Sequence, residues 1–317
     1  MVPRFECFCY ELKFVLYCIL KIRIFCQNRI SILPCPKKWI KCSMYSKIIS
    51  NFAVAFRSTG YNMSVENSNK INRLLQDYYP GKLYFSGNLK QLGYSDQLLK
   101  QYRNSGWLTA LSNGVMYRTG DKLLAYPALA SYNQQMGKSF HIAAHSALEL
   151  KGFNHYVPMG KSVLMIGHPK QQTVPNWLKE SYFDMSLKFF STKTFSKPQL
   201  SISNADGLDL LVSTPEQAFF ECLLLAPKHY DFMDLFYIME QLTTFRPEIV
   251  QDLLENTDSF KVRRLFLYMA EKAGHYWFDL LDVSKINIGT AKYQLVKNGV
   301  YVSKYKITIP KELHDYE

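Results

Sequence analysis

The chain has 317 residues, of which 48% are hydrophobic and 20% charged, and it carries a formal net charge of +12 at pH 7. The most apolar run near the start, residues 14–20, is too short for a membrane-spanning helix, which needs about 20 residues. Lysine and arginine residues flank this run closely, and no small-residue cleavage site follows it, so we expect no secretory signal either. We therefore expect no membrane contact and, with few cysteines outside the N-terminal region, a cytoplasmic protein.

The first 62 residues differ from the rest of the chain in composition. They hold six of the seven cysteines and ten Lys or Arg residues against two Glu, which is +8 of the total charge. No Cys-x-x-Cys pair indicates a zinc site, and a chain of this length needs no disulfide framework. We expect residues 1–62 to be a non-native or disordered upstream extension, with Met63 as the true start.

The charge divides again beyond Met63. Residues 63–130 contain eight basic and four acidic side chains, whereas residues 131–317 contain twenty of each. A basic excess confined to one short segment favours a module that binds a polyanion beside a neutral second domain. We expect a DNA-binding domain at residues 63–123 and a larger domain at residues 124–317.

Three short helices are predicted in the first of these domains. Apolar residues recur at helical spacing in the first, which Pro80 and Gly81 end: Ile71, Leu74, Leu75 and Tyr78. Ser86 is a candidate N-cap for a second helix, and Gly93 in a left-handed conformation ends it. Ser95 caps a third helix, which Gly106 ends. Two helices joined by a tight glycine turn indicate a helix-turn-helix.

The third helix has a continuous polar face. Gln97, Lys100, Gln101 and Asn104 follow the i, i+3, i+4, i+7 spacing, with Arg103 beside them. Glutamine and asparagine can bond adenine in a bidentate way, and lysine can reach guanine or a phosphate. The alternative is that this face is simply the solvated side of a surface helix.

A hairpin is predicted directly after the third helix. Strand-like runs at residues 107–112 and 115–118 flank Asn113-Gly114, the strongest short hairpin signal, in which both turn residues take positive φ. A hairpin in this position indicates a wing, whose tip and Arg118 can reach phosphates or the minor groove. The candidate DNA-binding residues are therefore Ser95, Gln97, Lys100, Gln101, Arg103, Asn104, Asn113 and Arg118. A winged helix that binds only protein is the alternative.

The larger domain mixes helices and strands, which predicts an α+β fold. Helices are expected at residues 124–135 and 143–151 and at three later positions that start near Thr214, Pro247 and Lys261. Thr214 is expected to cap its helix in a capping box that Gln217 completes. Strands are expected at residues 162–166, 183–190 and 200–203, and in the tail, at residues 292–310, around Asn298-Gly299.

Motifs that suggest catalysis are incomplete. The Gly-Lys-Ser triplets at 137–139 and 160–162 lack the first glycine of a phosphate-binding loop. His141 and His145 lie four residues apart without a third metal ligand, and Asp206 and Asp209 lack the Asp-x-Asp spacing of a nucleotidyltransferase. We expect no catalytic residues, cofactor or metal, and no enzymatic activity.

Several ordered segments resemble the AbiEi family of type IV toxin–antitoxin antitoxins, which are also transcriptional regulators. These segments are SGWLTALSNGVMY at 105–117, AHSALELKGFNHY at 144–156, PNWL at 175–178, VSTPEQA at 212–218, KVRRLFL at 261–267, AEKAGHYW at 270–277 and KYKITIP at 304–310. In this chain Ala110 and Ser112 stand where the family often has an arginine.

The resemblance implies an N-terminal winged helix-turn-helix followed by a larger mixed α+β domain. The first would bind double-stranded DNA at inverted repeats in its own promoter, and the second would help neutralise a nucleotidyltransferase-like toxin without a stable complex. Two alternatives stay open from the sequence: a stand-alone transcription factor whose larger domain senses a ligand or partner, and an enzyme, which the absent motifs disfavour.

Overall fold

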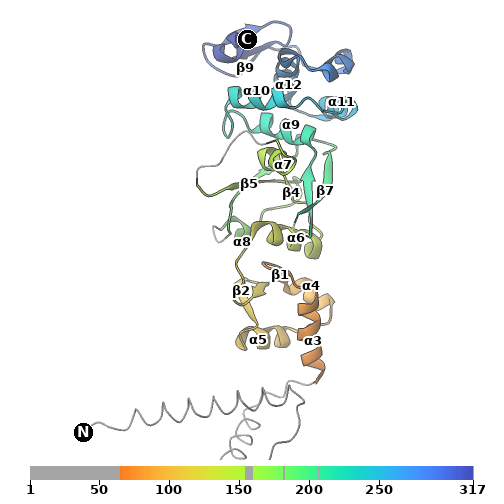
Figure 1. The fold of residues 1–317 in the computed structure, drawn as a ribbon, viewed down its shortest axis with the longest axis vertical. Coiled ribbons are helices and arrows are strands. Elements are labelled where there is room, and N and C mark those ends of the chain that lie inside the picture. The colour runs from red at the N-terminus through yellow and green to blue at the C-terminus, as the bar shows by residue number, and fades with distance from the viewer. Residues whose placement is uncertain (1–64, 154–159, 181–182, 206, 317) are drawn as a thin grey trace, which may run out of the picture. The chain divides into compact units, whose positions relative to one another are not determined.

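The computed structural model describes residues 65–153, 160–180, 183–205 and 207–316. The expected upstream extension, residues 1–62, lies outside these residues. Val65–Glu317 form one compact unit (Figure 1). In the part of the chain that is described, no helix is long and apolar enough to cross a membrane.

The first part of this unit consists of three helices and a small sheet of three strands. In chain order they are α3 (Val65–Gln76), β1 (Leu83–Phe85), α4 (Ser86–Gln91), α5 (Asp96–Asn104), β2 (Leu108–Ser112) and β3 (Val115–Arg118). The strands are antiparallel in the order β1-β3-β2, and Phe85 pairs with Val115. All three expected helices are present. Strand β1 was not predicted, because its three residues are all buried and show no alternation.

The helix ends differ in how they are capped. Ser95 caps α5 as expected, since its Oγ accepts a hydrogen bond of 3.2 Å from the Leu98 N–H. The prediction that Ser86 caps α4 is wrong. Phe85 occupies the N-cap position without a side-chain bond, and the Ser86 N–H donates instead to the Gly114 carbonyl at 2.8 Å.

The hairpin between β2 and β3 is present, but its turn differs from the expected one. Gly114 has φ +76°, whereas Asn113 does not have a positive φ. The pairing also shifts by one residue between Ala110 and Ser112. The extra residue, Leu111, makes a β-bulge in β2, a feature that increases the local twist of a strand pair.

The larger part of the unit contains a mixed five-stranded sheet in the order β6-β5-β4-β8-β7. Its strands are β4 (His141–Ile142), β5 (Val163–His168), β6 (Ser186–Ser191), β7 (Leu200–Ala205) and β8 (Leu208–Ser213). β5 runs parallel to β6, and β4 runs parallel to β8, while the other neighbours are antiparallel. β4 was not expected, because two residues are too short to give a pattern. The mixed α+β class is confirmed.

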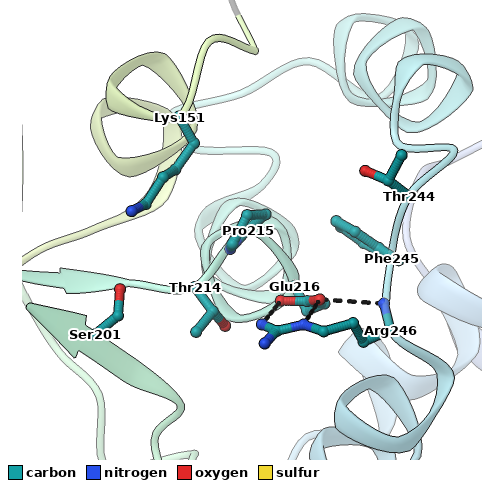
Figure 2. Close-up of a pocket in the computed structure, with 8 residues that line it drawn as sticks. All are labelled: Lys151, Ser201, Thr214, Pro215, Glu216, Thr244, Phe245 and Arg246. Carbon is teal, nitrogen blue, oxygen red and sulfur yellow. Dashed lines mark hydrogen bonds and ion pairs between the residues drawn. The ribbon is translucent and has the colours of Figure 1, made fainter. Parts of the chain in front are cut away.

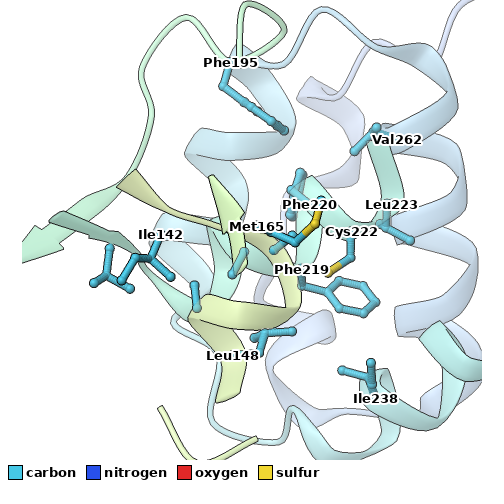
Figure 3. Close-up of a cluster of buried hydrophobic side chains, with 14 of the residues drawn as sticks. Ile142, Leu148, Met165, Phe195, Phe219, Phe220, Cys222, Leu223, Ile238 and Val262 are labelled. Atoms are coloured by element: carbon cyan, nitrogen blue, oxygen red, sulfur yellow. The ribbon is translucent and has the colours of Figure 1, made fainter. Parts of the chain in front are cut away.

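Helices cover this sheet and form the main core. They are α6 (Ala125–Met136), α7 (Ala144–Leu150), α8 (Asn176–Lys179), α9 (Pro215–Leu225), α10 (Phe232–Gln241), α11 (Pro247–Asn256) and α12 (Phe260–Ala273). α9 packs between α7 and α12 (Figure 1). Phe219, Phe220 and Cys222 of α9 are fully buried, and Figure 3 shows them in a cluster with Met165 of the sheet. α9 is buried on all sides, and its buried polar residues Glu216, Gln217 and Glu221 all have hydrogen-bond partners.

The C-terminal segment contains the strands expected around Asn298-Gly299. After the short 3-10 helices η1 (Tyr276–Leu280) and η2 (Val283–Lys285) come β9 (Tyr293–Gln294), β10 (Val300–Val302), β11 (Ile307–Ile309) and α13 (Lys311–Asp315). The strands on either side of Asn298-Gly299 do not form a hairpin, because β11 lies between β10 and β9. β9 pairs in parallel with β11. The Asn298 turn therefore lies in the connection from β9 to β11, which also contains β10.

Polar bonds join β1 to α6. The Leu83 N–H donates to the Ser131 Oγ at 3.1 Å, and the Phe85 N–H donates to the Gln135 Oε1 at 3.1 Å. The Gln135 amide in turn donates to the Leu83 carbonyl at 2.6 Å. The Phe85 ring also lies 5.7 Å from the ring of Trp177. The first sheet therefore continues into the core of the larger part.

Candidate nucleic-acid interface

Helix α5 presents the predicted polar face to the surface. Leu98, Leu99 and Tyr102 are buried against the neighbouring helices and strands. On the opposite face Gln97, Lys100 and Asn104 are exposed and Gln101 is half-buried. The buried apolar face of α5 therefore fixes the helix in place, and the side chains that could contact bases lie on its outer face.

Two of the predicted residues are engaged within the protein. The Ser95 hydroxyl is the cap of α5, so its oxygen is committed to the Leu98 N–H. Arg103 is exposed, and its Nη1 lies 3.3 Å from the Met116 Sδ on β3, which directs the guanidinium toward the hairpin. Asp96, in the first turn of α5, forms an exposed ion pair of 2.8 Å with Lys90 of α4, a contact that salt screens.

The hairpin tip is short. Asn113 and Gly114 are exposed, but β1 extends as far as the pair formed by Phe85 and Val115. A Cβ at Gly114 would lie 2.9 Å from the Ser86 Oγ, so α4 begins directly beside the turn. Only the two turn residues extend past the three-stranded sheet.

Arg118 lies at the other end of the hairpin. It pairs with Leu108, the first residue of β2, far from the Asn113 turn. Its guanidinium carbon lies 4.6 Å from the centre of the Tyr78 ring, and the Tyr78 hydroxyl donates to Asp121 at 2.8 Å. The structure therefore places Arg118 and Asn113 at opposite ends of the hairpin.

Two exposed side chains near α5 were absent from the predicted set. Lys90 lies in the last turn of α4, and Trp107, between α5 and β2, is 44% exposed. Lys90 lies outside the helical spacing that defined the polar face. Trp107 was assigned to a strand by its apolar character, and no feature of the sequence signals its exposure.

The histidines of the larger part have separate partners. His141 is buried on β4 with its Nε2 3.3 Å from the Glu221 Oε1. His145, on α7, has its Nδ1 2.7 Å from the Tyr230 hydroxyl, and burial lowers the pKa of its imidazole. The described residues include no group of three or more His, Cys, Asp or Glu side chains that could hold a metal ion.

Glu221 is the centre of a buried polar cluster. Besides His141, its carboxylate accepts bonds from the Ala144 N–H at 2.9 Å, from the Ser213 hydroxyl at 3.0 Å and from the Gln217 amide at 3.0 Å. Only one of the two hydrogen bonds of the predicted capping box is therefore present. The Thr214 Oγ1 accepts from the Gln217 N–H at 3.4 Å, but the Gln217 side chain turns to Glu221. The Thr214 N–H, which the capping box would have satisfied, donates to the Gln199 carbonyl at 3.0 Å, so the Gln217 amide can bond the buried carboxylate instead.

A hollow of about 350 Å³ lies at the start of α9 (Figure 2). One wall is an ion pair in which the Arg246 Nε and Nη2 each donate to Glu216 at 2.9 Å, and the Arg246 N–H donates at 3.2 Å. Burial alone would raise the pKa of Glu216, yet these bonds hold it below its usual value. The pair ties α9 to α11 and neutralises the charge of this wall, so the hollow offers no free acid or base there.

Comparisons with known proteins identify relatives of both parts. Residues 67–159 match a family model described as the N-terminal domain of the AbiEi antitoxin transcriptional regulator, and residues 161–310 match one described as the AbiEi antitoxin of type IV systems, also a transcriptional regulator. The crystal structure of the RV2827C protein from Mycobacterium tuberculosis has a similar fold, with a TM-score of 0.53 at 17% identity over 78% of this chain and 92% of that one. No curated protein matches the chain.

Proposed function

The chain belongs to the AbiEi family of antitoxin transcriptional regulators of type IV toxin–antitoxin systems, and on this premise we propose that it binds the promoter of its own operon through α5 and restrains a toxin encoded beside it. The proposal assigns these roles to different parts of the unit. DNA binding falls to residues 65–123 and toxin neutralisation to the residues that follow.

The order of elements supports DNA binding. Three helices and three strands follow one another as α3, β1, α4, α5, β2 and β3, with the sheet order β1-β3-β2. This order is typical of a winged helix-turn-helix, in which the last helix enters the major groove. The observation that carries the proposal is the exposed face of α5, which presents amide groups and a lysine. In this order of elements, α5 is the helix that would enter the major groove.

The side chains of α5 have separate roles in this proposal. Gln97, Gln101 and Asn104 contact base edges, because amide groups match adenine in the major groove. Lys100 and Arg103 contact phosphates, which fix register and orientation. Inverted repeats in the promoter require two copies of the chain related by a two-fold axis, one on each half-site.

The hairpin contributes less than a long wing would. Asn113 lies at a tip of two residues, and Ala110 and Ser112 of β2 carry no charge. Its contact with DNA is therefore limited to the Asn113 amide and the backbone of the turn. Sequence recognition depends mainly on α5.

The larger part supplies the antitoxin role. The group of residues that most resembles an active site is the buried Glu221 cluster. The oxygens of its carboxylate already accept hydrogen bonds from protein donors. We propose that it acts in the cytoplasm without catalysis, on a nucleotidyltransferase-like toxin, and without a stable complex. A nucleotidyltransferase-like reading frame next to the gene would support this role.

Base recognition is tested with the full chain and promoter DNA. Gln97→Ala with Gln101→Ala should weaken promoter binding by about 1–3 kcal/mol for each bidentate pair with a base that is removed, with little change on random DNA. Gln171→Ala, at an exposed glutamine of the larger part, is the matched control. If the double variant kept the wild-type ratio of promoter to random affinity, α5 would not be the reading helix.

A further inference from the structure

A second hollow, of about 570 Å³, lies at the carboxyl ends of two parallel strands. β5 and β6 run side by side and end together, where His168 pairs with Ser191. The Thr192 N–H donates to the His168 carbonyl at 3.0 Å, which keeps the two chain ends adjacent beyond the pairing. In open sheets with parallel strands, ligands bind in the crevice outside the carboxyl ends.

Each strand is followed by a lysine at the same distance. Lys170 stands two residues after the end of β5, and Lys193 stands two residues after the end of β6. Lys179, the last residue of α8, lines the hollow from a third side. The three ammonium groups therefore come from three separate elements that meet at one place.

The charge of this hollow is unbalanced. All three lysines are exposed, and none of the described residues that line the hollow is acidic. This contrasts with the neutral composition of residues 131–317 as a whole. Lysine ammonium groups attract phosphate as compact point charges, and three of them without a carboxylate repel one another until an anion binds.

The floor of the hollow contains a polar group without a partner. The Ser191 Oγ is buried, lines the hollow and has no hydrogen-bond partner among the described residues. Buried hydroxyls are normally bonded, and an exception calls for a water, ion or ligand that completes it. A ligand oxygen in the hollow is one such group. Phe189 supplies an apolar wall beside it.

We propose that this hollow binds the phosphate group of a phosphorylated ligand, with Lys170, Lys179 and Lys193 neutralising its charge and Ser191 donating a hydrogen bond. The phosphate has two possible sources, a phosphodiester of nucleic acid and a free phosphorylated small molecule. The site is separate from α5 and does not depend on DNA binding there.

The first experiment measures anion binding by the full chain without DNA. Inorganic tripolyphosphate should raise the thermal midpoint of the wild type and of a control in which Lys197, Lys228 and Lys311, all exposed elsewhere, become Gln. The variant Lys170→Gln/Lys179→Gln/Lys193→Gln should keep its midpoint without anion and lose the rise. Ser191→Ala should keep its fold, because it removes an unsatisfied group, and should bind tripolyphosphate about fivefold more weakly.

The second experiment separates the two sources of phosphate. If the hollow holds DNA phosphates, the triple variant should lower the slope of log affinity for promoter-length DNA against log salt by up to about 2.7, since each neutralised phosphate contributes about 0.9. An unchanged slope with a lost tripolyphosphate response assigns the site to a free phosphorylated ligand. If the triple variant matched the control in both measurements, the site would not exist. Loss of promoter binding in α5 variants leaves the tripolyphosphate result unaffected, so the two proposals fail separately.

Discussion

Gly167 on β5 lies directly against the imidazole of His141 on β4. A Cβ added at Gly167 would lie 2.6 Å from the His141 Cε1 and closer still to its Nε2. His141 is buried and held by Glu221, and the Thr192 methyl lies 2.9 Å from the same added Cβ on another side. The imidazole therefore occupies space that only a glycine at position 167 leaves open.

We expect Gly167→Ala to destabilise the protein by about 1–3 kcal/mol, because an extra methyl in a packed core forces side chains off their rotamers. Chemical denaturation of the full chain measures this. Gly87→Ala in α4 is the matched control, since nothing lies within 4 Å of its added Cβ. Alanine there should be neutral or stabilising by up to about 1 kcal/mol. Equal stability of both variants would show that His141 can move away.

Removal of the Glu221 carboxylate should cost more. Glu221→Ala leaves the Ala144 N–H, the Ser213 hydroxyl and the Gln217 amide without their acceptor inside the core. Each buried donor left unsatisfied costs about 1–3 kcal/mol, so we expect a loss of at least about 3 kcal/mol in the free energy of unfolding. Glu312→Ala, at an exposed position on α13, should change it by less than about 0.5 kcal/mol. A loss below about 1 kcal/mol would mean that water replaces the carboxylate.

The ion pair of Glu216 and Arg246 predicts a pH dependence. Glu216 is 2% exposed, and its bonds to Arg246 hold its pKa below the usual value of about 4.3. A group whose pKa is lowered on folding stabilises the protein above its unfolded pKa and loses this contribution as the pH falls through the folded pKa.

In Arg246→Gln the burial of Glu216 dominates and raises its pKa, so the variant becomes less stable as the pH rises past about 4. The difference in unfolding free energy from the wild type should be largest near pH 7 and should shrink below about pH 4. Glu216→Gln/Arg246→Gln should largely remove the pH dependence of this difference. A difference that stayed constant from pH 3 to pH 7 would contradict this account.

The sequence predicted those elements whose local signals agree with their packing. Ser95 caps α5 because its side chain bonds within its own turn, and Thr214 caps α9 in the same way. β1 and β4 could not be predicted, because two or three buried residues carry no period. The bond from Gln217 to Glu221 was also hidden, since a capping motif gives no sign of a buried carboxylate one turn further along the helix.

The candidate interface was predictable in part for the same reason. The polar face of α5 follows from helical spacing alone, so Gln97, Lys100 and Asn104 lie on one exposed face as expected. The position of Arg118 depends on Tyr78, forty residues earlier, and only the folded sheet brings the two together. The lysines of the second hollow come from three separate elements, so no motif joins them in the sequence.

The stacking of Arg118 on Tyr78 predicts a structural effect for this residue. Arg118→Ala should lower the free energy of unfolding by about 0.5–1 kcal/mol, the value of an exposed cation–π contact. Its effect on promoter affinity should be smaller than that of Lys100→Ala, because Lys100 lies on the outer face of α5. Thermal denaturation and promoter titration of both variants, together with Lys122→Ala as an exposed basic control, compare the two effects. A larger loss of affinity in Arg118→Ala would return this residue to the DNA interface.

Repression and protection from the toxin should separate in the full chain. A truncation at residue 124 is a poor test, because it would remove β1 from α6 and leave the Ser131 hydroxyl and the Gln135 amide without the partners that β1 supplies. Lys100→Glu with Asn104→Glu leaves these bonds intact. It places two negative charges on the outer face of α5, where they repel phosphates.

We expect this double variant to lose promoter binding and repression in a reporter assay, and to keep the wild-type midpoint of thermal unfolding. It should still protect cells that express the neighbouring toxin, because the larger part is unchanged. Expression must come from an unrelated promoter at matched protein levels, since loss of repression alters abundance. Lys228→Glu with Thr243→Glu adds the same charges to the exposed surface of the larger part, away from the second hollow, and should keep repression. If the α5 variant were folded and equally abundant but gave no protection, the toxin would be countered through the DNA-binding part, and the proposed division of roles would be wrong.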